Sequence, residues 1–188
     1  MRILCFILIL LPIAGFSQTD TSGFQTGYGS SEGADRVPST EVTIPPTVEA
    51  LQATLYELDD QYHAIHQMHW NVTGPLFISL HELYEEFYTA IAAKMDEVAE
   101  RKLALDEAAD ARPAEVAANA NLSPAVPGGF VTDKESLELL SARHLQISNR
   151  LGDRIADTGE TDVVTQDLLI ALRDMIDKQL WMMRSFLK

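Results

Sequence analysis

The sequence predicts an all-α domain in which four long helices form a bundle, with a short extra helix in the long crossover between helices 2 and 3. Three observations lead to this fold class. Apolar residues recur at alternating steps of four and three, the same stretches are rich in Ala, Leu, Glu, Asp and Met, and Pro or Gly residues separate them. This order gives two helical hairpins joined by one long connection.

An apolar stripe and a helix-ending Gly-Pro pair predict the first helical hairpin. The first helix begins near Thr47, and residues 74–75, Gly-Pro, end it. Ser79 and Glu82 match a capping box, so we expect the second helix to run from about Ser79 to about Leu105. The stripe of the first helix consists of Leu51, Leu55, Leu58, Tyr62, Ile65 and His69. A histidine therefore stands where another core residue is expected.

The second hairpin follows a proline- and glycine-rich crossover, residues 106–131, in which residues 113–120 can form the short extra helix. Thr132 and Glu135 form another capping box, which predicts a third helix up to about residue 157. Gly159 is a C-terminal stop, and a fourth helix is expected over residues 161–186.

Residues 1–17 precede the bundle and show the pattern of a secretory signal peptide: Arg2, an apolar run, and small residues before Gln18. The alternative is a membrane anchor, but the apolar run is shorter than the ~20 residues that a spanning helix needs. We therefore expect cleavage and export to the periplasm or the medium, and a cytoplasmic location if the leader does not function. Cys5 is the only cysteine, so the mature chain has neither a disulfide nor a thiolate ligand.

Residues 18–46 form a Gly-, Ser- and Thr-rich tail that we expect to be disordered, which leaves residues 47–188 as the folded domain. The formal net charge of the whole chain is −14. This charge argues against general binding of nucleic-acid phosphates or anionic membranes, and it suits a protein that attracts cations. The alternative is that the acidity only keeps the protein soluble.

A set of metal-ligating side chains lies on the second helix. His81 and Glu85 are four residues apart, and so are Asp96 and Glu100. At 100° per residue, all four positions fall within about 100° of one another and share one face. Imidazole and carboxylate ligands suit iron, manganese or zinc, and a carboxylate-rich set without sulfur favours iron. Each residue taken singly has a structural alternative, as part of a solvated face or as a core histidine.

The spacing of these pairs predicts a site shared between two subunits. Their centres lie 15 positions apart, about 22 Å along a helix, which is too far for one metal cluster. The third and fourth helices contain one histidine, His144, and no Glu stands three residues before it. They therefore lack the Glu-x-x-His motif of metal sites built within one chain. If the second helix packs antiparallel against its copy, each pair meets the other pair of the partner, and His69 can join the first pair.

These residues resemble the Dps family of ferritin-like mini-ferritins over about residues 47–188. The similarity is strongest in His69-Trp70-Asn71, Gly74, Phe77-Ile78, His81-Glu82, Met95-Asp96 and Ala99-Glu100-Arg101. The resemblance implies a ferritin-like bundle and a hollow homododecamer built from twofold dimers. It also implies oxidation of Fe(II), preferably with hydrogen peroxide, at di-iron sites between subunits, with the ferric mineral stored inside.

By motif position, the resemblance implies that His69, His81 and Glu85 of one subunit and Asp96 and Glu100 of the other are the iron ligands. Glu85 stands where the family commonly has Asp. Trp70 is implied as a donor of electrons or an acceptor of radicals, and the alternative is an aromatic residue packed at the subunit interface. The resemblance also suggests that acidic residues around the last turn line iron-entry pores, although they can equally form a solvated turn: Asp153, Asp157, Glu160, Asp162 and Asp167.

His63 and His66 precede His69 at three-residue steps, and each rotates about 60° further from the stripe. We therefore expect them to be surface or interface histidines and not metal ligands. Three functions compete with iron storage: a DNA-compacting protein without enzyme activity, a manganese or other metal enzyme, and a shell whose metal site has decayed. The acidic tail and the absence of a basic cluster near Lys188 argue against the first.

Overall fold

The structure is a computed structural model that describes residues 45–188. The predicted signal peptide and nearly all of the predicted tail therefore lie outside the described residues. The described chain contains four long helices, one short helix and two two-residue strands. Their bounds are α1 Pro45–Asn71, β1 Val72–Thr73, α2 Phe77–Ala104, α3 Pro113–Asn119, β2 Val131–Thr132, α4 Asp133–Thr158 and α5 Val163–Phe186.

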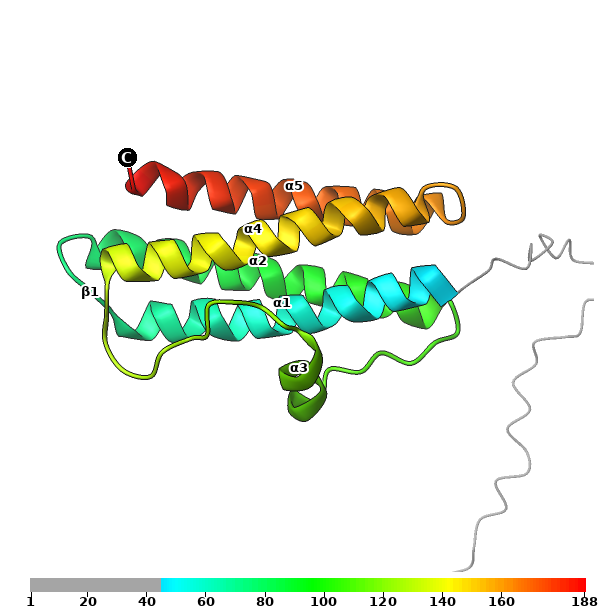
Figure 1. Ribbon diagram of the computed structural model, residues 1–188, viewed down its shortest axis with the longest axis horizontal. Coiled ribbons are helices and arrows are strands. Elements are labelled where there is room, and N and C mark those ends of the chain that lie inside the picture. Colours follow the sequence, from blue (N-terminus) through cyan, green and yellow to red (C-terminus); the bar gives the residue numbers. More distant parts are fainter. Residues whose placement is uncertain (1–44) are drawn as a thin grey trace, which may run out of the picture. The chain divides into compact units, whose positions relative to one another are not determined.

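The predicted all-α bundle is confirmed, including the short helix in the crossover. Helix α1 packs along α2 and α4 along α5, so that each hairpin forms one side of the bundle (Figure 1). Helix α1 also packs against α4, whereas α2 and α5 contact each other much less. Helix α3 lies outside the four long helices and contacts α1. None of the helices that residues 45–188 form is long and apolar enough to cross a membrane.

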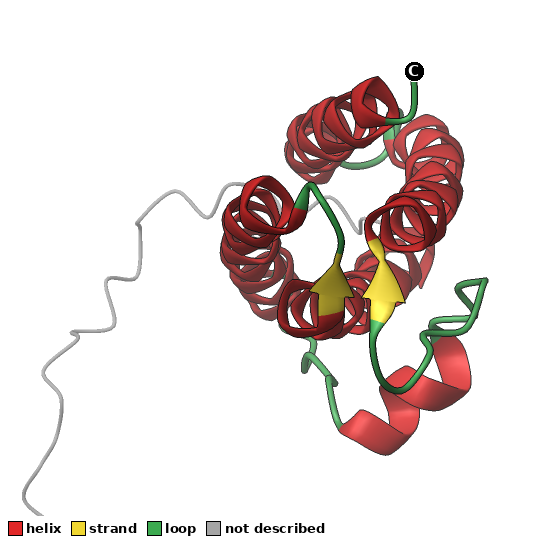
Figure 2. Ribbon diagram, turned by 90° about the vertical axis from the view of Figure 1, so that its left-hand side faces the viewer, coloured by secondary structure: helices red, strands yellow, loops and turns green. Residues whose placement is uncertain are grey.

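The apolar stripe of the first helix packs into the core as predicted. Leu51, Leu58 and Ile65 are fully buried, and His69 at the end of the stripe is buried as well. At the same end of the bundle, β1 and β2 pair in parallel and connect the two hairpins (Figure 2). The sequence did not predict these strands, because a two-residue pairing has no periodicity to recognise.

The helix ends match the predictions in part. The capping box of Thr132 and Glu135 opens α4 as predicted, with hydrogen bonds in both directions. The predicted capping box at Ser79 was wrong, because α2 begins two residues earlier, after a tight turn in which the Phe77 amide donates to the Gly74 carbonyl. Gly159 caps α4 without a left-handed conformation. The side-chain amide of Gln166 fills the space beside Gly159, and a β-carbon at position 159 would clash with it.

A chain of buried hydrogen bonds crosses all four long helices. Arg143 of α4 donates to the Gln61 oxygen of α1 at 2.8 Å, and an arginine can only donate, so the Gln61 nitrogen donates in turn to His144 at 2.9 Å. His144 then bonds the Gln179 oxygen of α5 at 2.8 Å, and the Gln179 amide reaches the Phe87 carbonyl of α2. Burial lowers the pKa of the His144 imidazole, which keeps this link neutral. His144 is therefore a structural residue of the core.

Two further arginines of α4 bond one buried carboxylate of α1, and one of them also attaches the crossover to the bundle. Glu57 of α1 is buried and accepts hydrogen bonds from both Arg150 and Arg154 of α4, at 2.6–2.9 Å. Arg150 also donates to the carbonyls of Ala120 and Asn121, at the C-terminal end of α3. Because carbonyls at a helix end carry partial negative charge, this contact stabilises α3 against the bundle.

We predict that Glu57→Gln lowers the free energy of unfolding by about 3 kcal/mol, because it leaves two arginines beside a neutral group in a largely buried place. Glu115→Gln is the matched control, since Glu115 pairs with Arg112 at the surface, and such pairs contribute at most ~1 kcal/mol. Urea unfolding of both variants at one protein concentration measures the difference. Equal destabilisation by the two substitutions would contradict the prediction.

Candidate metal centre

Two predicted ligands from different helices form a tight pair. His69, near the end of α1, and His81, in the second turn of α2, stack with their ring centroids 3.8 Å apart. The Nδ1 of His69 lies 2.7 Å from the His81 carbonyl, and the Nδ1 of His81 lies 2.9 Å from the His69 carbonyl. The pair therefore ties the end of α1 to the start of α2 through two reciprocal hydrogen bonds.

These bonds determine which nitrogen of each ring is available. A carbonyl oxygen only accepts, so Nδ1 must carry the hydrogen in both His69 and His81. In the neutral rings, Nε2 is then unprotonated, and no hydrogen bond among residues 45–188 occupies it. Metal-bound histidines have this arrangement, in which the second ring nitrogen donates to a carbonyl or carboxylate. The pair is thus preorganised to offer two Nε2 atoms to a metal ion.

The three predicted carboxylate ligands are exposed on α2. Glu85 follows His81 by one turn, and Asp96 and Glu100 lie toward the other end of the helix. Within the part of the chain that the structure describes, none of these three side chains forms a hydrogen bond or an ion pair. Their neighbours pair elsewhere: Lys94 bonds Glu97 at 2.6 Å. The carboxylates are therefore available to a ligand or to a partner subunit.

The single chain keeps the two halves of the predicted site apart. It brings His69 and His81 together, with Glu85 on the next turn, whereas Asp96 and Glu100 lie near the far end of the 28-residue helix α2. Across residues 45–188, no three His, Cys, Asp or Glu side chains are grouped so that they could hold a metal ion. The assignment of all five ligands to one site shared between two subunits therefore stays a prediction.

Aromatic rings surround the histidine pair. Trp70 is 60% exposed and lies against His66, with ring centroids 4.2 Å apart. Tyr88 stacks on His66, with ring centroids 4.2 Å apart, and meets the His69 ring edge-on at 5.4 Å. Sequence reasoning missed Tyr88, although it follows His81 by seven residues, two turns along the same face of α2. Burial, followed by the nearby Glu85 charge, raises its pKa.

One residue of the predicted acidic pore cluster has a different role. Asp162 is buried, caps α5 by accepting from the amides of Val164 and Thr165, and pairs with Arg101 of α2 at 2.8 Å. Burial alone favours the neutral acid, but the hydrogen bonds from Thr165 and Arg101 together outweigh it and lower the pKa of Asp162. Asp162 thus holds the end of α2 that carries Glu100, and it is not free to line a pore.

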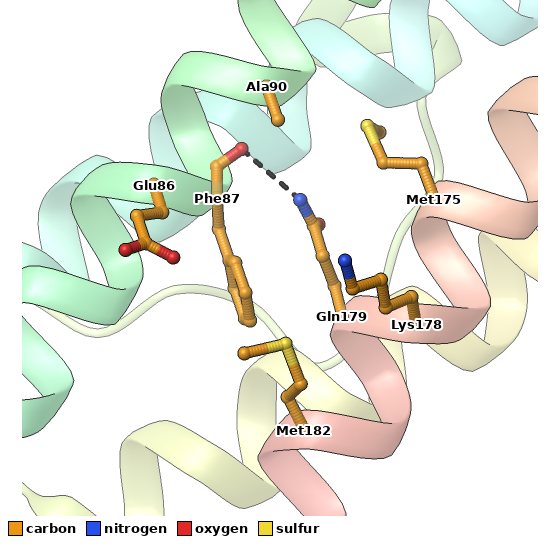
Figure 3. A pocket seen from close by; sticks show the side chains of 7 residues that line it. All are labelled: Glu86, Phe87, Ala90, Met175, Lys178, Gln179 and Met182. Atoms are coloured by element: carbon orange, nitrogen blue, oxygen red, sulfur yellow. Dashed lines mark hydrogen bonds between the residues drawn. The ribbon is translucent and has the colours of Figure 1, made fainter.

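A pocket of about 220 Å³ lies between α2 and α5, lined mainly by apolar side chains such as Phe87, Met175 and Met182, with Glu86 and Lys178 beside them (Figure 3). Glu86 and Ala90 of this pocket face away from His81 by about 140–180° around α2. The pocket is therefore separate from the candidate metal centre.

Comparisons with known proteins show the family to which the chain belongs. Residues 48–188 match the family model described as a ferritin-like domain. The DNA protection during starvation protein 2 of Bacillus anthracis is 30% identical over 140 residues, which cover 74% of this chain and 95% of that protein. The chain belongs to the ferritin-like Dps family.

A curated protein and a solved structure from Deinococcus radiodurans are more similar in sequence than this relative. DNA protection during starvation protein 2 is 36% identical over 142 residues, 76% of this chain, and the match spans only 58% of that protein's length. The crystal structure of Dps92 from the same organism is 35% identical and superposes with a TM-score of 0.75, covering 77% of this chain and 87% of that one. The Dps fold and family are thus established for residues 48–188.

We predict that Asp162→Asn destabilises the protein by about 1–2 kcal/mol near neutral pH, because the charged hydrogen bonds to Arg101 are lost. The lowered pKa means that this stability is fully present above the unfolded value of ~3.9 and is lost as the pH falls through the folded value. The gap between wild type and variant should therefore close in acid. Urea unfolding at neutral and acidic pH tests this, and an equal gap at both would refute it.

Proposed function

We propose that this Dps protein is an iron-sequestering ferroxidase. It oxidises Fe(II), preferably with hydrogen peroxide, at di-iron sites between twofold-related subunits, and it stores the ferric mineral in a hollow homododecamer. One observation carries the proposal: the reciprocal hydrogen bonds of His69 and His81, which leave both Nε2 atoms without a partner within residues 45–188, one helical turn from the exposed carboxylate of Glu85. Family membership supports iron as the substrate.

The proposed site takes its ligands from two chains. His69, His81 and Glu85 of one subunit face Asp96 and Glu100 of the partner when two α2 helices pack antiparallel. A twofold dimer then contains two equivalent sites. The exposed apolar side chains of Phe77 and Ile78 beside His81 suit burial in such an interface.

The reaction follows from the ligand set. Carboxylates stabilise Fe(III) more than Fe(II), because the attraction grows with the charge of the ion, and this favours oxidation. Two Fe(II) ions give one electron each to a peroxide molecule, which takes up two protons and becomes two waters. Pairing the electrons avoids the release of a hydroxyl radical. Trp70, exposed beside the site, is proposed to donate an electron when only one Fe(II) is present.

The proposal includes export, which rests on the signal-peptide pattern of residues 1–17 alone. Periplasmic or secreted protein should begin at Gln18, and intact-mass measurement of the mature chain tests the cleavage site. Such a protein would protect the cell by removing Fe(II) and peroxide together.

Subunit mixing tests the shared site directly. His81→Gln and Asp96→Asn each remove one ligand with little change in size, and each assembly alone should lose most of its peroxide-dependent Fe(II) oxidation. In a co-expressed mixture, half of the random dimers are mixed, and each mixed dimer has one intact site of its two, so about a quarter of the activity should return. Native mass spectrometry confirms that the mixed shells are dodecamers.

The control mixes the two variants after separate assembly. Native mass spectrometry checks that subunits have not exchanged, and no activity should then return. A folded mixed assembly without recovered activity would show that the ligands act within one chain. Oxidation by a folded monomer would refute the proposal as well.

The alternative function within this family is DNA protection by direct binding, as the names of the relatives suggest. A net charge of −14 opposes it, since general binding to DNA depends on neutralising phosphates with Lys and Arg side chains. We predict no shift of plasmid DNA in a gel assay of the mature protein at physiological salt. A shift that weakens as salt increases would instead favour the DNA-binding function.

A further inference from the structure

His144 lies in the middle of the hydrogen-bond chain that crosses the four long helices. Its side chain on α4 is fully buried. Its neighbours from the other three long helices are neutral: Gln61 of α1, Phe87 of α2 and Gln179 of α5. The charge beside it is that of Arg143 on α4, whose carboxylate partner, Asp60, lies on α1. A proton added to this imidazole would therefore place a second positive charge in the core.

The directions of the hydrogen bonds determine where the neutral ring carries its hydrogen. Arg143 donates to the Gln61 oxygen, so the Gln61 nitrogen donates to Nδ1 of His144 at 2.9 Å, and Nδ1 has the lone pair. Nε2 carries the hydrogen and donates to the Gln179 oxygen at 2.8 Å, and Gln179 continues to the Phe87 carbonyl (Figure 3). Burial lowers the pKa of this imidazole, and the charge of Arg143 acts in the same direction.

A second hydrogen on the ring disrupts this chain. Nδ1 also lies 3.0 Å from the Leu140 carbonyl, one helical turn earlier, which can accept from the protonated ring. The Gln61 nitrogen then faces another donor, and a turn of the Gln61 amide would point the same nitrogen at Arg143. Two buried cations, His144 and Arg143, thus compete for the single side-chain oxygen of Gln61.

Arg143 is the cation that has room to move. His144 is enclosed on all sides, whereas the Arg143 side chain lines a pocket of about 300 Å³ between α1 and the crossover. Asp60 lines the same pocket, and its side chain is 34% exposed. Because an arginine side chain is long, Arg143 can turn into this pocket and keep its ion pair with Asp60.

Arg143 also holds the crossover against the bundle. Its guanidinium donates to the carbonyls of Leu122 and Pro124, at 3.4 and 3.0 Å. Gln146 of α4 bonds Ser123, but a neutral amide forms weaker hydrogen bonds than a guanidinium does. A second pocket, of about 370 Å³, also lies between α1 and the crossover, so this part of the chain is loosely packed. Movement of Arg143 would therefore release it.

We propose that Gln61 and Arg143 couple protonation of His144 to the release of the crossover segment, residues 122–126, so that this segment opens from α1 in acid. The closed state binds the extra proton less readily than the open state, from which Arg143 has moved away. The closed state is therefore fully stable above the ordinary imidazole pKa of ~6.5 and loses stability as the pH falls below it. The contacts that carry this coupling involve none of the five predicted metal ligands.

A single cysteine in the segment tests the coupling in the assembled mature protein. Cys5, the only cysteine of the chain, lies in the predicted leader, so Val126→Cys supplies one thiol, half-buried beside both pockets. Its labelling rate with dithiodipyridine is divided by that of Phe130→Cys, an 83% exposed position of the same crossover. This ratio should rise as the pH falls below ~6.5, by up to about tenfold per pH unit, because one proton is taken up.

Three variants carrying Val126→Cys separate the coupling from general acid sensitivity. His144→Gln keeps an acceptor for Gln61 and a donor for Gln179 but takes up no proton, so its labelling ratio should stay constant. His63→Gln is the matched control, because it removes an exposed histidine, and its ratio should rise as in wild type. Arg143→Gln removes the guanidinium that holds the segment, and it should label fast already at neutral pH.

Native mass spectrometry at each pH limits the comparison to assembled protein. A constant ratio in the otherwise wild-type chain, or an equal rise in the His144→Gln variant, would overturn the proposal. Slow labelling of the Arg143→Gln variant at neutral pH would do so too, and this measurement serves if His144→Gln does not fold. None of these results depends on the proposed ferroxidase site.

Discussion

Two hydrogen bonds between His69 and His81, each from an imidazole to the other residue's backbone carbonyl, are the interaction on which the candidate site depends. They join the last turn of α1 to the first turns of α2, beside the short strands that connect the two hairpins. The same bonds assign the proton to Nδ1 and leave Nε2 as a ligand atom. The same contact thus joins two helices and orients two ligand atoms. The rings of His66 and Tyr88 lie beside it.

The carboxylates of α2 limit how two copies of the chain can pack together. Glu85, Asp96 and Glu100 are exposed and unpaired within the described chain, where water screens their charges. An antiparallel α2 pair would bring Glu85 toward Asp96 and Glu100 of its partner and remove part of that water. Like charges in such an interface are unfavourable unless cations lie between them. Metal binding and dimer formation should therefore be thermodynamically linked, each favouring the other.

Local sequence patterns predicted the helices and their ends well where interactions between residues close in the chain determine them. The aliphatic residues of the stripe from Leu51 to Ile65 are buried, and Thr132 with Glu135 caps α4, because periodicity and capping depend on neighbouring residues. Ser79 matched the same capping pattern and was wrong, since the turn at Gly74 starts α2 earlier. Asp162 was grouped with free acids, because its partner Arg101 is 61 residues away in the chain and invisible to local patterns.

The sequence by itself determined the bundle and the shared face of His81, Glu85, Asp96 and Glu100, and it led to the hypothesis of a site shared with a second subunit. These follow from the fixed rise and rotation of an α-helix, which convert spacing into geometry. Only the tertiary structure decided how α1 and α2 align: the stacking of His69 on His81, their Nδ1–H tautomers and the placement of His66 between two aromatic rings. Such contacts join residues from different helices, so they depend on packing and not on spacing along one helix.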